Sequence, residues 1–158
     1  MEISFFGSNE NKINIMPDQI NSMTYSDTIK VKMKSQEFYD ITGKVEDIVR
    51  KAEIEDEIED GICNIFVAGA TGSVIINENE PMLLEDLKKT LEKISSSKEL
   101  YHHMENAFSH IRSALIGSNQ SIPVRDGKLV LGTWQNILIV NFDTEDKERE
   151  VIVTVVGD

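Results

Sequence analysis

Apolar and polar residues alternate through residues 28–34, where Ile29, Val31 and Met33 are each followed by a lysine. A period of two is typical of a β-strand with one buried face and one exposed face. The lysines therefore form a row on the exposed face. We interpret this row as a solvated strand surface rather than a binding surface.

Apolar residues recur every three or four positions after Thr42, which is the predicted N-cap of an amphipathic helix. The acidic run at residues 53–60 is interpreted as the solvated end of this helix or a loop, and Gly61 ends the segment. A second helix is predicted from Pro81 to the serines at 95–97, with Asn79 or Glu80 as its cap. The predicted buried positions are Val45, Ile48, Val49 and Ala52 in the first helix and Leu83, Leu84, Leu87, Leu91 and Ile94 in the second.

The other apolar segments are short and bounded by turn-forming residues, which indicates strands. Asp126 and Gly127 are predicted to form a two-residue hairpin turn of type I′. Residues 134–142 and 151–156 are predicted to form another hairpin across the charged loop 143–150. Two to three helices on one face of this antiparallel meander would bury it, so the pattern predicts an α+β fold. The predicted strands are residues 62–68, 74–77, 120–124, 128–131, 134–142 and 151–156.

Residues 1–25 are polar, rich in asparagine and weakly patterned. Segments 2–6 and 12–16 could pair as a small hairpin, and disorder fits this composition equally well. Met16 and Met23 leave a later translation start open. Since 158 residues is the length of one domain, we predict an N-terminal extension over residues 1–25 and a single domain over residues 26–158.

The formal net charge of −12 argues against nucleic acid as a partner, because it repels phosphate backbones and the basic residues form no continuous run. Local cations and backbone amides can still hold a small anion. No apolar run approaches the roughly 20 residues that span a bilayer, and no secretory signal is present. The lone Cys63 excludes an internal disulfide and fits a reducing compartment. We therefore expect a cytoplasmic protein without a membrane partner.

Polar groups that can hold a metal or a phosphate are concentrated between Tyr101 and Gln135. All three histidines, His102, His103 and His110, lie in this stretch. Divalent metals such as zinc favour two or three His or carboxylate ligands from neighbouring elements. However, the spacing matches neither His-Glu-x-x-His nor a Cys/His finger. Surface or helix-capping histidines are therefore the alternative interpretation.

Other candidate ligands lie on both sides of these histidines. Residues 69–73 form a Gly/Thr/Ser turn that either presents backbone N–H groups to an anion or is an ordinary turn. Glu78 follows the next strand, where a carboxylate can cap a helix or bind a metal. Asn106 is the predicted N-cap of a short helix that continues through residue 116. Trp134 is expected in the core, and the neighbouring Gln135 needs a hydrogen-bond partner there.

Several of these segments resemble the signature of the YjbQ-like family, whose members are often described as secondary thiamine-phosphate synthases. The resemblance covers about residues 26–158, and Gly69-Ala70-Thr71 resembles the form found in archaeal members. The matching segments are Ser113-Ala114-Leu115-Ile116-Gly117, Ile122-Pro123-Val124, Asp126-Gly127-Lys128-Leu129 and Leu131-Gly132-Thr133-Trp134-Gln135.

The resemblance implies a compact α+β fold built around an antiparallel β-sandwich and assembled as a homotrimer. The implied activity joins a pyrimidine pyrophosphate to a thiazole phosphate and releases pyrophosphate, with a divalent metal, zinc or Mg²⁺, as cofactor. A small phosphorylated molecule is therefore the expected partner. The implied catalytic residues are His110 and Glu78, the metal ligands are His102, His110 and Glu78, and the phosphate-binding residues are Thr71, Asn106, Arg112, Ser113, Thr133 and Gln135.

Two departures from the family pattern weaken the metal site. Many bacterial members have His-Thr-Thr where this chain has Gly69-Ala70-Thr71, and Phe108 stands where relatives often have Asp or His. Both changes leave an anion pocket less affected than a metal site. They favour an alternative function, namely a non-catalytic trimeric protein that binds a ligand or a metal.

Overall fold

The computed structural model describes residues 22–158. The proposed hairpin of segments 2–6 and 12–16 lies outside these residues. The first strand begins at Met23, a few residues before the predicted domain boundary. In chain order the elements are β1 (Met23–Met33), β2 (Glu37–Asp40), α1 (Thr42–Asp56), β3 (Gly61–Val67), β4 (Gly72–Asn77), α2 (Pro81–Ile94), α3 (Ala107–Ile116), β5 (Asn119–Arg125), β6 (Lys128–Leu129), β7 (Asn136–Asn141) and β8 (Lys147–Gly157).

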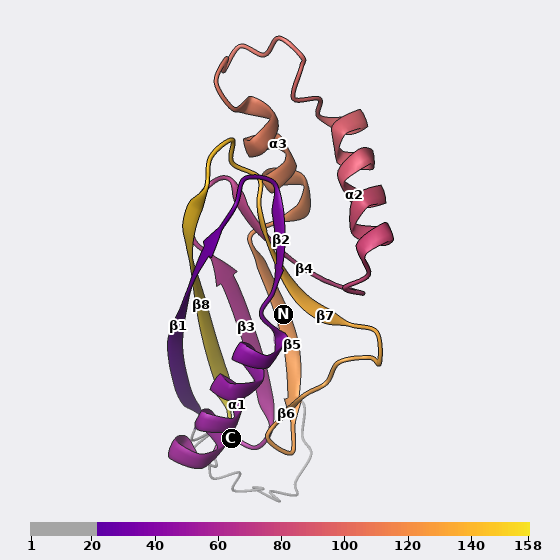
Figure 1. The fold of residues 1–158 in the computed structure, drawn as a ribbon. Helices are drawn as coiled ribbons and strands as arrows, with labels where there is room; N and C mark the ends of the chain where they lie inside the picture. The colour runs from indigo at the N-terminus through magenta and orange to yellow at the C-terminus, as the bar shows by residue number, and fades with distance from the viewer. Residues whose placement is uncertain (1–21) are drawn as a thin grey trace, which may run out of the picture.

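The strands form two antiparallel sheets, which confirms the predicted α+β class (Figure 1). The larger sheet has the order β1-β8-β3-β5-β6, and the smaller has the order β2-β7-β4. The predicted hairpin of residues 134–142 and 151–156 is wrong, because β7 pairs with β2 and β4 whereas β8 pairs with β1 and β3. The charged loop between β7 and β8 therefore crosses from one sheet to the other.

β7 belongs to two apolar clusters because both of its faces are covered. Ile137 and Ile139 lie in the main core, which both sheets share with α1. Val140 and Phe142 point the other way and pack with Leu91 of α2. This double burial explains why the segment is almost continuously apolar rather than alternating.

Carboxylates accept hydrogen bonds from the first residues of α1 and α2. Asp40 Oδ1 accepts hydrogen bonds from the N–H and the hydroxyl of Thr42, so α1 begins at the residue that was predicted to cap it. Glu80 accepts from the N–H groups of Met82 and Leu83, which confirms it as the cap of α2. A carboxylate at this position also favours the positive end of the helix dipole.

The lysine row of β1 is paired with glutamates of β8, as a solvated strand face requires. Lys30 lies opposite Glu150 with a separation of 2.9 Å between Nζ and Oε1, and Lys32 lies opposite Glu148. At the β5–β6 turn, Asp126 and Gly127 have φ angles of 49° and 66°, the positive values that a type I′ turn needs. None of the helices within residues 22–158 is long and apolar enough to cross a membrane.

Candidate functional site

An open pocket of about 470 Å³ lies at the end of the sheets that carries α3. One wall is the loop between β3 and β4, with Gly69 and Ala70, and the other is α3 with the segment that follows it. Residues 110, 113, 114 and 117 line it because positions three and four apart fall on one helix face. Figure 1 shows α3 and this loop side by side at the upper end of the molecule.

His110 lies between this pocket and a second cavity of about 530 Å³, which is also lined by Tyr101, His102, His103 and Ile111. The ring of His103 meets the ring of His110 edge-on, with 5.3 Å between their centroids. The sequence-based prediction paired His110 with His102, but the structure places His103 beside it. His102 is exposed on the loop before α3.

Asn106 occupies the N-cap position of α3, as predicted, but its side chain makes no capping hydrogen bond. Its Oδ1 lies 3.0 Å from Nε2 of His103 instead. This contact fixes one nitrogen of the His103 ring and leaves the other available to a ligand. Asn106 therefore acts on the site through His103.

The hydroxyls of Thr71 and Ser113 are already engaged within the chain. Ser113 Oγ donates to the carbonyl of Gly72 at 2.8 Å, which ties α3 to the start of β4. Thr71 Oγ1 donates to Asp143 Oδ2 at 2.9 Å and accepts from Arg149 Nη2 at 2.8 Å. Both side chains therefore hold the pocket wall in place.

Arg112 points away from this pocket, toward α2. Its Nε and Nη2 donate to the carbonyl of Ser95 at 3.1 and 2.7 Å, and Nη1 donates to Gln36 Oε1 at 2.9 Å. Nη2 also forms an ion pair with Glu92. Each nitrogen of the guanidinium thus has a protein acceptor, and a phosphate would compete with these acceptors.

The remaining predicted residues, Glu78, Thr133 and Gln135, form a separate group. Asn77 pairs with Asn136, so Glu78 and Gln135 flank the same end of the β4–β7 ladder. Gln135 Oε1 accepts the N–H of Gly132 at 2.7 Å and so finds its partner within the loop that precedes β7. In Figure 1 this loop projects sideways, away from α3. One chain therefore does not bring the two groups together.

Trp134 corrects another prediction, because it is 71% exposed rather than in the core. Strand β7 begins only at Asn136, so Trp134 lies in the projecting loop that precedes it. Gly132 and the local hydrogen bond to Gln135 form the turn that keeps this segment out of the sheet.

No three His, Cys, Asp or Glu side chains within residues 22–158 converge so as to hold a metal ion. His102, His110 and Glu78 come from the two separate groups described above. The donor set of a single chain therefore does not fit a zinc ion held by three protein ligands.

A buried polar cluster beneath the β3–β4 loop was missed by the sequence reasoning. It comprises Arg149 and Asn141 together with Thr71 and Asp143, all of them buried. The sequence pattern does indicate that Arg149 is buried, because it lies two residues before Val151 and therefore on the same inward face of β8. Only the structure shows what it meets there.

The charges in this cluster shift each other's ionisation. Burial by itself would raise the pKa of Asp143, but the hydrogen bond from Thr71 and the nearby positive charges of Lys147 and Arg149 outweigh it and lower that pKa. Burial lowers the pKa of Arg149, against the opposing effect of Asp143. The ordinary pKa of a guanidinium is so high that Arg149 stays protonated at neutral pH.

Comparisons with known proteins agree with the fold and with the motifs. A family model described as UPF0047 protein YjbQ-like matches residues 27–158. A UPF0047 protein of Archaeoglobus fulgidus is 38% identical over 123 residues, 76% of this chain and 91% of that protein. A UPF0047 protein of Methanocaldococcus jannaschii is 35% identical over 127 residues, 79% of this chain and 88% of that protein.

Solved structures show the same likeness. A YbjQ-like protein of unknown function from Sulfolobus solfataricus superposes with a TM-score of 0.81 at 37% identity, covering 87% of this chain and 99% of that one. A YjbQ/UPF0047 protein of Clostridium acetobutylicum gives 0.74 at 33% identity, with 82% and 98% coverage. The resemblance inferred from the motifs is therefore confirmed, and the chain belongs to the YjbQ-like (UPF0047) family.

Proposed function

We propose that this protein is a cytoplasmic enzyme of thiamine-phosphate synthase type that handles a small phosphorylated molecule in the pocket beside His110. The observation that carries the proposal is the position of His110 between two adjoining cavities. One cavity is walled by small residues and backbone, which suits a phosphate, and the other by aromatic and apolar side chains, which suits a ring. A phosphorylated heterocycle has both parts.

In the proposed reaction a pyrimidine pyrophosphate is joined to a thiazole phosphate and pyrophosphate leaves. His110 is the side chain placed to donate a proton to the leaving group, because its imidazole borders both cavities. Since the described side chains of one chain do not form a zinc site with three protein ligands, we assign no step to a metal held by the protein. Mg²⁺ is ordinarily carried by the phosphates of a substrate and needs few protein ligands.

We also propose that the protein works as a homotrimer, which would bring Glu78, Thr133 and Gln135 of one protomer toward His110 of another. Exposed apolar residues support self-association. Trp134 in the projecting loop is one. Others gather on the outer face of the larger sheet, where Ile62 pairs with Val156 and Phe66 with Ile152, all four exposed. Covering such a patch is favourable in proportion to its apolar area.

A second function is favoured by the internal hydrogen bonds of Thr71, Ser113 and Arg112. Because these side chains already have partners, the pocket has few groups left for chemistry, and a non-catalytic trimer that binds the same ligand is the alternative. The two functions differ in one observable, the formation of product.

The test is pyrophosphate release from the two phosphorylated precursors with Mg²⁺ supplied, alongside the metal content of untagged protein purified without chelator. We expect turnover that is lost in His110→Ala and Glu78→Ala and kept in Glu55→Ala, which removes an exposed carboxylate from α1. Turnover unchanged in both site variants would show that these roles are wrong. Saturable binding without any product would establish the non-catalytic alternative.

A further inference from the structure

The loop between β3 and β4 contains three successive backbone N–H groups, those of Gly69 and Ala70 at the pocket and that of the buried Thr71. None of them donates a hydrogen bond to another residue within 22–158. Gly69 and Ala70 are exposed and line the pocket beside His110. Gly69 adopts a φ of 109°, which a residue with a side chain rarely adopts. Successive amides in such a turn form a concave anion-binding surface.

Arg149 lies directly beneath this loop. It is only 6% exposed. A Cβ added to Gly69 would lie 3.0 Å from Nη1 of Arg149, and one added to Gly72 would lie 3.4 Å from the same atom. The absence of a side chain at Gly69 thus leaves room for the guanidinium close beneath the loop backbone, and Gly72 lies against the same group.

The guanidinium is incompletely satisfied by the protein. Nη2 donates to the carbonyl of Thr71 at 3.0 Å, to its hydroxyl at 2.8 Å and to Asn141 Oδ1 at 2.5 Å. Nε is buried and has no hydrogen-bond partner among the described residues. Nη1 has none there either, and the hydroxyl of Thr71 lies between Arg149 and Asp143, donating to the carboxylate and accepting from Nη2. A buried charge with so few partners costs free energy unless a further anion offsets it.

We propose that the Gly69–Thr71 loop and Arg149 together form the phosphoryl subsite of the pocket. The backbone N–H groups donate to the phosphate oxygens, and Arg149 supplies the positive charge from beneath the loop and holds the loop in its binding geometry. This inference deepens the proposed function, because it names the groups that would hold the ligand's phosphate. The positive charge that binds the phosphate is thereby assigned to Arg149, whereas the sequence analysis assigned it to Arg112.

The chemistry of the subsite suits a small, highly charged oxyanion. Apart from His110, the walls are small residues, namely glycine, alanine and serine, so they leave room for a tetrahedral group but offer few apolar contacts. No acidic side chain is among the residues that line this pocket. With a net charge of −12 over the whole chain, a buried local cation is what such an anion requires.

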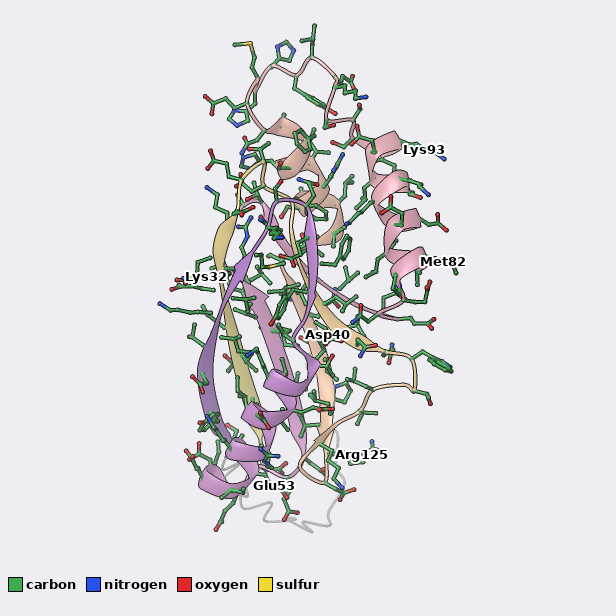
Figure 2. The ribbon with its side chains drawn as sticks, viewed as in Figure 1. Lys32, Asp40, Glu53, Met82, Lys93 and Arg125 are labelled. Carbon is green, nitrogen blue, oxygen red and sulfur yellow. The ribbon has the colours of Figure 1, made fainter. Side chains whose placement is uncertain are left out.

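The test is a titration of ¹⁵N-labelled protein with inorganic pyrophosphate, followed through the amide resonances. The variants are Arg149→Met, which removes the charge, and Arg149→Lys, which keeps it. Arg125→Met is the control for the loss of one positive charge, because Arg125 is exposed and lies at the opposite end of the sheets (Figure 2). The dispersion of the spectrum reports in the same sample whether each variant is folded.

We expect the amides of residues 69–71 to shift most in the wild-type protein and in Arg125→Met. Affinity should fall at least about tenfold in Arg149→Met and less in Arg149→Lys, since charge-assisted hydrogen bonds are lost. Shifts that fall on other residues, or an unchanged affinity in a folded Arg149→Met, would overturn the inference and leave the proposed function standing. If Arg149→Met does not fold, the inference stands or falls on whether the amides of residues 69–71 shift most in the wild-type protein. The absence of shifts anywhere would count against the proposed function itself.

Discussion

The guanidinium of Arg112 on α3 forms an ion pair with the carboxylate of Glu92 on α2, and this pair joins two helices that otherwise share few contacts. Arg112 also donates to the carbonyl of Ser95 at the end of α2 and to Gln36 in the β1–β2 turn. Its side chain is only 6% exposed. The arginine that the family resemblance assigns to phosphate binding therefore connects three separate parts of the chain.

Replacing Arg112 should destabilise the fold more than it weakens a phosphate ligand. Arg112→Met removes the hydrogen-bond donor to the Ser95 carbonyl and the ion-pair partner of the Glu92 carboxylate. We therefore expect a loss of about 3 kcal/mol in the free energy of unfolding. Urea denaturation measures this. Arg125→Met, at an exposed site, should change stability by less than about 0.5 kcal/mol. Equal stability of both variants would contradict the connecting role.

Glu92 should contribute to the acid sensitivity of the protein. Burial by itself raises its pKa, but hydrogen bonds from the Ser97 N–H, from Arg112 and from the hydroxyls of Ser97 and Ser96 outweigh burial and lower the pKa to about 2. Because the folded state favours the ionised form, this stabilisation is complete above the ordinary pKa of 4.5 and is lost as the pH falls toward about 2.

The measurement is the unfolding free energy of Glu92→Gln and of the wild-type protein between pH 6 and pH 2.5. We expect the difference between them to shrink as the pH falls, since the wild-type carboxylate becomes protonated. A constant difference over this range would mean that Glu92 titrates normally in the folded protein.

Thr71→Val should destabilise the buried cluster beneath the β3–β4 loop. Its hydroxyl donates to Asp143 and accepts from Arg149, so the isosteric valine removes one hydrogen bond from each of two buried charged groups. We expect a loss of about 2 kcal/mol in thermal or urea denaturation. Thr28→Val, at an exposed position of β1, is the control. If Thr71→Val leaves the stability unchanged, Asp143 and Arg149 compensate for the lost hydroxyl by contacting each other directly.

Trp134 should report on the proposed trimer, because it is the only tryptophan and is 71% exposed in one chain. If the projecting loop lies in the interface, acrylamide will quench its fluorescence less in the assembled protein than after dilution. Trp134→Ala should weaken association by about 2 kcal/mol or more, as buried interface tryptophans do. Sedimentation measures the association. A trimer that persists unchanged in Trp134→Ala places this loop outside the interface.

Cys63 should be unreactive in the folded protein. It is fully buried in β3, and burial raises the pKa of its thiol to about 12. Because the thiolate is the reactive form, a thiol reagent at pH 8 should modify the protein only at the rate of unfolding. Since the folded pKa is raised, this group also lowers stability above pH 9.0, where the unfolded thiol ionises. Rapid labelling in native buffer would contradict both statements.

The family, the α+β class and most element positions could be predicted from the sequence, because they depend on local periodicity and on specific motifs. The pairing partners of β7 and β8 could not be predicted. Both strands are apolar and follow one another, which favours a hairpin, yet β7 is covered on two faces and β8 alternates between core and solvent. The distinction depends on α2, which is distant in sequence and packs on β7.

The site was predicted less completely, because residue type does not show which way a side chain points. The positions of His110 and Ser113 at the pocket follow from the helix face on which they lie. Arg112 is their direct neighbour but points toward α2, since one step along a helix turns a side chain by about 100°. Arg149 lies far along the chain and reaches the site only through the sheet register.

The position of β8 has a consequence for synthesis on the ribosome. Among the strands of residues 22–158, β8 leaves the ribosome last, yet it lies between β1 and β3, and its register joins Met23 to Gly157. Until it emerges, both neighbouring strands have unpaired edges, which are prone to aggregation. The larger sheet therefore closes only after β8 has emerged, and a nascent chain stopped before Lys147 should remain sensitive to protease and dependent on chaperones.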